Sequence, residues 1–86
     1  MLNIYAASWC PHCRKAVEFF EENQIEYNYI DMETQPESVV KKVVEVNGGD
    51  DWVVPTLEYN GGWEKGKVFN AEELRNDLIK LGALKV

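Results

Sequence analysis

The sequence has little of several things, and each shortage excludes a class of protein. Only two of its 86 residues are cysteines, so a network of structural disulfides is excluded. No segment approaches the roughly 20 apolar residues of a membrane span. Residues 1–5 lack the basic segment that opens a signal peptide. We therefore expect a cytoplasmic protein that does not associate with a membrane.

Basic residues are also scarce, because nine Lys and Arg face fifteen Asp and Glu, for a formal net charge of −6. Nucleic acids and anionic membranes require a basic patch, so neither is an expected partner. The hydrophobic fraction is 45% and includes three Trp, four Tyr and three Phe. This is enough apolar material for the core of one small domain over residues 1–86, without a metal or a disulfide.

What the sequence does have is its two cysteines in one tight pair, Cys10-Pro11-His12-Cys13. In a reducing compartment, a single Cys-x-x-Cys is more often catalytic or metal-binding than structural. Zinc needs four ligands, and this stretch offers three, of which His12 is too close to its neighbours to reach the same ion easily. The pair therefore favours redox chemistry. A metal or cluster shared between two chains is the remaining alternative.

The hydrophobic pattern predicts alternating strands and helices in the first half of the chain. Residues 2–6 form a short apolar strand, and Pro11 suits the first position of a helix, where its missing N–H costs nothing. Residues 25–31 alternate apolar and polar side chains, as a strand does. A second helix follows, because Thr34 and Glu37 make a capping-box pattern. Its apolar stripe and its stop are Val39, Val40, Val43 and Val44, then residues 47–49.

The second half of the chain predicts a hairpin and a last helix. Residues 52–59 form a third strand, Asn60-Gly61 is a strong hairpin signal, and residues 63–68 or 63–69 return antiparallel to it. Asn70 with Glu73 caps the last helix. The apolar face of that helix and its stop are Leu74, Leu78, Leu81 and Gly82. The element order is therefore β-α-β-α-β-β-α.

The position of each sulfur predicts its role, because the thiolate is the nucleophile in disulfide exchange. Cys10 lies at the predicted helix start, where free N–H groups and the helix dipole stabilise a thiolate. Cys13 lies one turn further on, on the apolar face. We expect Cys10 to be the more exposed, attacking sulfur and Cys13 the buried, resolving one. Cys10 would form a mixed disulfide with the substrate, and Cys13 would then release it.

Three neighbours of the pair are candidates for tuning or for substrate contact. Pro11 and His12 separate the cysteines and would tune their reduction potential. His12 would place a hydrogen bond or a positive charge beside the Cys10 sulfur, although a solvated histidine without a role is equally compatible with the sequence. Trp9 directly precedes the nucleophile, which favours substrate contact over packing.

The interpretation of a second segment, Val54-Pro55-Thr56, depends on the presence of the cysteine pair. An isolated Pro would only mark the start of a strand. Together with Cys10-Pro11-His12-Cys13 and the terminal hairpin and helix, the segment resembles the glutaredoxin type of the thioredoxin superfamily, over essentially the whole chain. The resemblance implies an α/β thioredoxin fold of minimal glutaredoxin type, in which three helices flank a central four-stranded mixed sheet.

The same resemblance implies roles for particular residues and a function. Pro55 would be cis and pack against the cysteine pair, the backbone of Val54 would pair with the substrate, and Asn70 and Ala71 would offer helix-start N–H groups to glutathione. The implied function is a thiol–disulfide oxidoreductase of cell redox homeostasis, a monomer that carries electrons to protein disulfides or glutathione-mixed disulfides. It would bind no cofactor. Glutathione would be a co-substrate, and glutathione or thioredoxin reductase the electron source.

The chain departs from the family pattern in three places. His12 stands where dithiol glutaredoxins usually have Tyr, residues 6–8 lack a Lys that often holds a glutathione carboxylate, and residues 69–72 replace a Gly-Gly-acidic segment. These departures keep a second interpretation open, a redoxin that thioredoxin reductase reduces and that serves ribonucleotide reductase. A third interpretation, a dimeric glutaredoxin that binds an iron–sulfur cluster, is disfavoured by Cys13 and Pro11.

Overall fold

The computed structural model describes residues 1–85 and confirms the predicted order of strands and helices, with one added 3₁₀ turn. No helix in that range is both long enough and apolar enough to cross a membrane. The strands are β1 (Leu2–Ala6), β2 (Tyr27–Asp31), β3 (Thr56–Tyr59) and β4 (Gly62–Glu64). The helices are α1 (Pro11–Glu22), α2 (Glu37–Val46) and α3 (Ala71–Leu81), and the 3₁₀ turn is η1 (Met32–Thr34).

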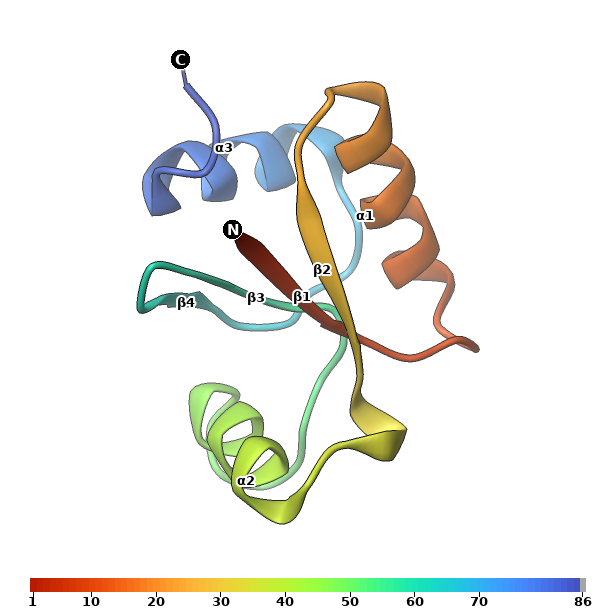
Figure 1. Ribbon diagram of the computed structural model, residues 1–86, viewed down its shortest axis with the longest axis vertical. Helices are drawn as coiled ribbons and strands as arrows, with labels where there is room; N and C mark the ends of the chain where they lie inside the picture. The colour runs from red at the N-terminus through yellow and green to blue at the C-terminus, as the bar shows by residue number, and fades with distance from the viewer. Residues whose placement is uncertain (86) are drawn as a thin grey trace.

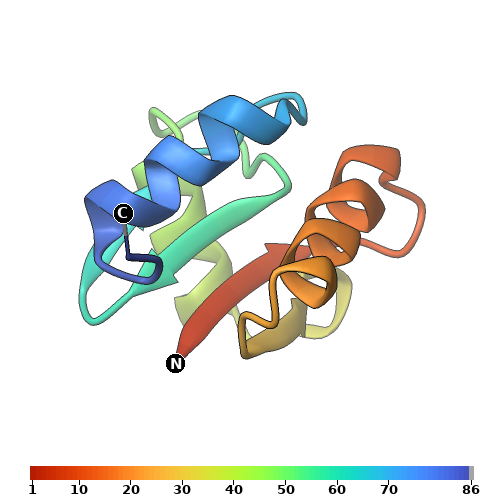
Figure 2. The same ribbon diagram turned by 90° about the horizontal axis from the view of Figure 1, so that it is seen from above.

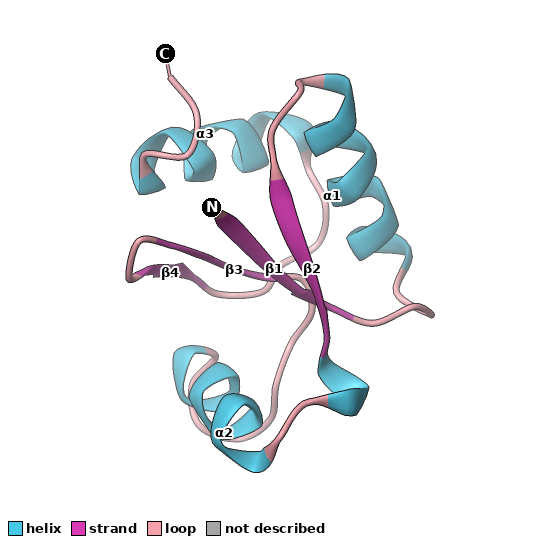
Figure 3. Ribbon diagram, viewed as in Figure 1, coloured by secondary structure: helices cyan, strands magenta, loops and turns pink. Residues whose placement is uncertain are grey.

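The four strands form one mixed sheet in the order β2-β1-β3-β4. Strand β1 is parallel to β2 and antiparallel to β3, so Ile4 lies opposite both Tyr29 and Leu57. Helices α1 and α3 cover one face of the sheet and α2 covers the other (Figures 1 and 3). Viewed from above, α1 and α3 lie beside each other (Figure 2). The sheet thus separates a two-helix layer from a one-helix layer.

The main core lies between the sheet and the α1–α3 layer. Along β1, Leu2, Ile4 and Ala6 are buried, whereas Asn3 and Tyr5 point to the α2 side and are half-buried. This alternation follows from the two-residue period of a strand. The core also takes in both cysteines, together with Ala16, Phe19, Phe20, Leu57, Leu74 and Leu78. Packing therefore fixes the start of α1 against the end of β1.

Strand β2 begins at Tyr27, two residues later than predicted, because the preceding residues end α1. Gln24 is left-handed, with φ 56°, and the N–H of Ile25 donates to the carbonyl of Phe20 at 2.8 Å. This is the hydrogen-bond pattern of a Schellman motif. Because the N–H of Ile25 is hydrogen-bonded to the end of α1, it is not available for pairing in the sheet.

The predicted cap of the second helix is wrong. Helix α2 begins at Glu37 with Pro36 as its N-cap, and no side chain caps it. Thr34 instead ends η1, where its hydroxyl donates to the carbonyl of Asp31 at 3.2 Å. The valine stripe does form a helix, as its period predicts, and Val43 is fully buried. Period therefore outweighs the β-propensity of valine here.

Three local signals in the second half are confirmed. Asn60 and Gly61 adopt φ 50° and 85° and join β3 to β4. The Asn70 side chain accepts the N–H of Glu73 at 3.0 Å as the N-cap of α3. Gly82 ends α3 in the left-handed conformation, with φ 88°. Each of these features depends only on residues within a few positions of it in the sequence.

Strands β3 and β4 are shorter than predicted, and Asn47 contacts the start of the first and the loop after the second. Its amide Nδ2 donates to the carbonyl of Val43 at 2.8 Å and to the Thr56 hydroxyl at 2.9 Å. Its Oδ1 accepts the N–H of Gly66 at 2.7 Å. A Cβ on Gly66 would lie 2.5 Å from a methyl group of Val53, so only glycine fits there. One half-buried side chain thus ties α2, the start of β3 and residues 65–70 together.

We expect Asn47→Ala to lower the free energy of unfolding by about 1–3 kcal/mol, because the Gly66 N–H and the Thr56 hydroxyl lose a buried partner. Urea unfolding of the reduced protein measures the change. The control is Asn76→Ala on the exposed face of α3, which should stay within about 0.5 kcal/mol of the parent. Equal effects of the two substitutions would contradict the role of Asn47.

Candidate active site

Cys10 is the N-cap of α1, and its side chain faces the free N–H groups of the first turn. Its backbone is extended, with φ −88° and ψ 111°, and Pro11 takes the first helical position. The Cys10 Sγ accepts the N–H of Cys13 at 3.1 Å. This places the sulfur at the positive end of the helix dipole, where negative charge is stabilised. The predicted position of Cys10 at the helix start is confirmed.

Both cysteines are buried, and Cys10 is the more exposed of the two, as predicted. The exposed fraction is 3% for Cys10 and 1% for Cys13, so the expected order holds but the difference is small. The segment before β3 provides part of the cover. The Cys10 thiol donates to the carbonyl of Val54 at 3.8 Å, and Val54 packs against the same core. Little of the Cys10 side chain is therefore left open to solvent.

Cys13 is held as a neutral thiol. Burial raises the pKa of Cys13 to about 12. The hydrogen bond with Cys10 and the negative charge that Cys10 can carry add to this rise, while the backbone of Ala7 opposes it. The two sulfurs thus differ in environment: Cys10 receives an N–H donor, whereas Cys13 keeps its proton.

The Val54–Pro55 peptide bond is cis, as the sequence resemblance implies. The segment lies directly beside the cysteine pair through the contact between Val54 and Cys10. It is anchored from behind by Thr56, whose fully buried hydroxyl donates to the carbonyl of Val53 and accepts from Asn47. Sequence reasoning missed Asn47 as an anchor, because nothing in its local pattern, a helix stop, indicates a contact with β3.

His12 makes its hydrogen bond to a loop residue and not to the Cys10 sulfur. Its Nδ1 accepts the backbone N–H of Phe69 at 3.1 Å, in the loop before α3. The hydrogen bond to the Cys10 sulfur that the sequence predicts is not among those of residues 1–85. A helical residue two positions along the chain projects from a different face, which accounts for the difference. The structure thus brings His12 to the loop that leads into α3.

Trp9, Asn70 and Ala71 lie around the pair at the surface. Trp9 is 58% exposed, and its ring lies 6.3 Å from that of Trp52, centroid to centroid. Asn70 caps α3 and Ala71 is its first residue, both exposed. The predicted site residues therefore come from three segments that meet at one end of the sheet.

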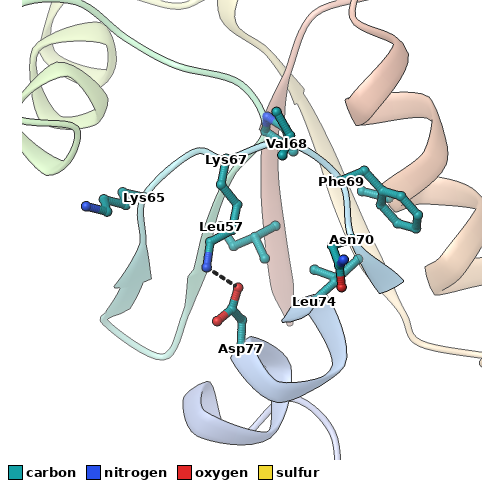
Figure 4. A pocket seen from close by; sticks show the side chains of 10 residues that line it. Leu57, Lys65, Lys67, Val68, Phe69, Asn70, Leu74 and Asp77 are labelled. Carbon is teal, nitrogen blue, oxygen red and sulfur yellow. Dashed lines mark ion pairs between the residues drawn. The ribbon is translucent and has the colours of Figure 1, made fainter. Parts of the chain in front are cut away.

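A small pocket of about 30 Å³ lies between the proline segment and the loop before α3 (Figure 4). Pro55 and Leu57 line one side, and Phe69 and Asn70 line the other. An ion pair of 2.9 Å between Lys67 and Asp77 crosses it. The hydrogen bond to Asp77 raises the pKa of Lys67 above its usual value. The pocket has room for about one water molecule, so ligands must bind over it rather than inside it.

Tyr29 on β2 is a further neighbour that sequence reasoning missed. Burial raises the pKa of its phenol, and the negative charges that Cys13, Asp31 and Cys10 carry when ionised raise it further. The register of β1 with β2 places Tyr29 level with Ile4, on the face that α1 covers. In the sequence, Tyr27 and Tyr29 are two residues apart in a predicted strand, which indicates only that both side chains lie on the same face of the sheet.

Comparison with known proteins agrees with this geometry. The family model described as Glutaredoxin matches residues 2–62, more than half of the chain. Mycoredoxin 1 of Corynebacterium glutamicum is 38% identical over 61 residues, which cover 71% of this chain and 72% of that protein. This identity extends over most of both chains, so the relationship is not confined to the cysteine motif.

Solved structures show the same fold at lower identity. A glutaredoxin from Archaeoglobus fulgidus superposes with a TM-score of 0.69 at 24% identity, over 87% of this chain and 82% of that one. A buckwheat glutaredoxin–glutathione complex superposes with a TM-score of 0.66 at 15% identity, over 96% and 71%. The predicted thioredoxin fold of glutaredoxin type is confirmed. The chain belongs to the glutaredoxin family and is a glutaredoxin-like thiol–disulfide oxidoreductase.

Proposed function

We propose that Cys10 is the attacking thiol and Cys13 the resolving thiol of a dithiol exchange. The observation that carries this proposal is the unequal environment of the two sulfurs. The Cys10 Sγ accepts an N–H at the start of α1, whereas burial keeps the proton on Cys13. Because the thiolate is the reactive form, the first attack falls to Cys10.

The exchange then proceeds in two balanced steps. The Cys10 thiolate attacks one sulfur of the substrate disulfide, a bond forms between them, and the other substrate sulfur leaves as a thiolate. Cys13 next gives up its proton and attacks the Cys10 Sγ, which closes the Cys10–Cys13 disulfide and releases the second substrate thiol. The substrate gains two electrons, and the protein loses them. Two molecules of a small thiol reopen the protein disulfide and leave as their own disulfide.

The surface around the pair supports a polypeptide or thiol partner at Trp9, Val54, Pro55 and the start of α3. The Val54 carbonyl lies 3.8 Å from the Cys10 sulfur, so a substrate backbone along this segment brings its disulfide to Cys10. The exposed Trp9 ring offers an apolar contact next to it. Asn70 and Ala71 place the first amides of α3 on the far side, where a carboxylate of a small thiol would be favoured.

The co-substrate we propose is a low-molecular-weight thiol, glutathione or mycothiol. Membership of the glutaredoxin family and the identity with a mycoredoxin support it. Glu72 and Glu73 in the first turn of α3 work against anion binding there, so affinity for the thiol is expected to be modest. The partners are disulfide-containing proteins. We place the protein in the cytoplasm as a monomer, where a reducing environment keeps the pair open.

Substitution of each cysteine separates the two roles. We expect Cys13→Ser to accumulate a covalent mixed disulfide on Cys10, because no second thiol releases it. Cys10→Ser should lose about a thousandfold or more in turnover and trap nothing. Intact-protein mass spectrometry after incubation with a disulfide peptide measures both. Trapping by Cys10→Ser but not by Cys13→Ser would reverse the assignment.

The pKa of about 12 for Cys13 predicts the pH dependence of its alkylation. In Cys10→Ser, burial remains, and it is the largest cause of the rise. The rate with iodoacetamide should therefore keep increasing above pH 10, since the thiolate fraction grows until the pH passes the pKa. A free cysteine derivative, with a pKa of about 8.5, should level off near pH 9 in the same assay. An alkylation rate of Cys13 that levels off below pH 9 would contradict the raised pKa.

The electron source is tested by coupling the protein to purified reductases. We expect NADPH oxidation with hydroxyethyl disulfide when glutathione or mycothiol and the matching reductase are present. With thioredoxin reductase and no small thiol, the rate should equal that of the reductase alone. The opposite pattern would support the redoxin that serves ribonucleotide reductase and refute the small-thiol proposal.

A further inference from the structure

His12 makes a contact that the exchange steps do not use. It lies between the two cysteines in the first turn of α1, and its Nδ1 accepts the N–H of Phe69 at 3.1 Å. Phe69 directly precedes Asn70, the N-cap of α3. A single hydrogen bond thus joins the turn that carries the sulfurs to the backbone that leads into α3, across 57 residues of sequence.

The loop at residues 65–70 is held at its other end too. The N–H of Gly66 donates to Asn47 at 2.7 Å, and Lys67 pairs with Asp77 of α3 at 2.9 Å. Between these anchors, Val68 is 65% exposed and projects no side chain into the core, whereas Phe69 packs against the core. The loop and Pro55 line the same pocket (Figure 4). The loop is therefore one wall of the site, and His12 fixes its end nearest to the sulfurs.

Acceptance at Nδ1 also defines the state of the imidazole. A ring nitrogen that accepts an N–H carries no proton, so the neutral ring has its proton on Nε2. Nδ1 is then unavailable as a donor to a thiolate. His12 therefore acts as a hydrogen-bond acceptor for the loop. The donor to the Cys10 sulfur is the backbone amide of Cys13.

We propose that His12 is a positioning residue for the small-thiol half of the substrate. By holding Phe69, it keeps the loop and the start of α3 at a fixed distance from Cys10. It therefore sets the affinity for a mixed disulfide and not the reactivity of the Cys10 sulfur. This inference rests on the proposed function, in which the small thiol of a mixed disulfide lies between Cys10 and the start of α3.

Two substitutions and two probes separate positioning from tuning. His12→Leu removes the acceptor at similar size, whereas His12→Asn keeps one, because its Oδ1 occupies the place of Nδ1. The first probe is a peptide–glutathione mixed disulfide, whose glutathione carboxylates would extend toward the loop and α3 under the proposed function. The second is bis(2-hydroxyethyl) disulfide, which has no carboxylate and is too short to reach them. Both are assayed with the full-length protein.

We expect His12→Leu to raise KM for the mixed disulfide about three- to tenfold, the range for loss of one hydrogen bond, with kcat within about twofold. Its rate with bis(2-hydroxyethyl) disulfide should stay within about twofold of the parent. His12→Asn should restore KM for the mixed disulfide. Amide hydrogen exchange at Phe69, followed by NMR, should accelerate in His12→Leu and not in His12→Asn.

A parallel loss with both probes would show that His12 tunes the sulfur and would overturn the inference. So would an unchanged KM in His12→Leu, unchanged exchange at Phe69, or a parent protein that does not favour the mixed disulfide over the small probe. The proposed dithiol function fails separately, when the parent protein reduces neither probe. In that case the inference falls with it, even where the exchange at Phe69 confirms the hydrogen bond.

Discussion

The amide of Cys13 donates to the Cys10 sulfur at 3.1 Å, and the remaining parts of the site are arranged around that bond. It exists because Cys10 is the N-cap of α1 and Pro11 begins the helix without an N–H of its own. Core packing then holds Cys13 behind it, with its proton retained. One helix start thus supplies both the stabilised sulfur and the neutral one, from two residues three positions apart.

Side chains outside the sheet complete the site. Residues 53–55 and 65–70 lie outside the strands, and Asn47 ties the start of β3 to the second of these segments. His12 then ties the second segment to the cysteine turn. A sheet alone would hold only β3 and β4 in register and would leave these loops free. Two polar side chains, Asn47 and His12, therefore link these segments to each other and to the cysteine turn, and their contacts with Gly66 and Phe69 span 19 and 57 residues of sequence.

The sequence predicts the elements well where the signal is local. The turn at Asn60-Gly61, the cap at Asn70 and the stop at Gly82 each need only their immediate neighbours, and all three form. The cap at Thr34 fails although its pattern is equally local, because the chain uses residues 32–34 for a 3₁₀ turn and begins α2 at Glu37. The end of β4 and the start of β2 differ for the same kind of reason, since Asn47 takes the N–H of Gly66 and the end of α1 takes the N–H of Ile25.

The environment of the site is less predictable from the sequence, because burial and distant partners decide it. A spacing of three residues places Cys10 at a helix start, but it does not reveal that the Val54 segment covers the sulfur down to 3% exposure. An apolar cover alone would make a cysteine inert. Here the N–H of Cys13 offsets that cost at the sulfur, while the cover limits access. The contact with Val54 and the N–H of Cys13 therefore act on the same sulfur in opposite ways, because the first covers it and the second stabilises negative charge on it.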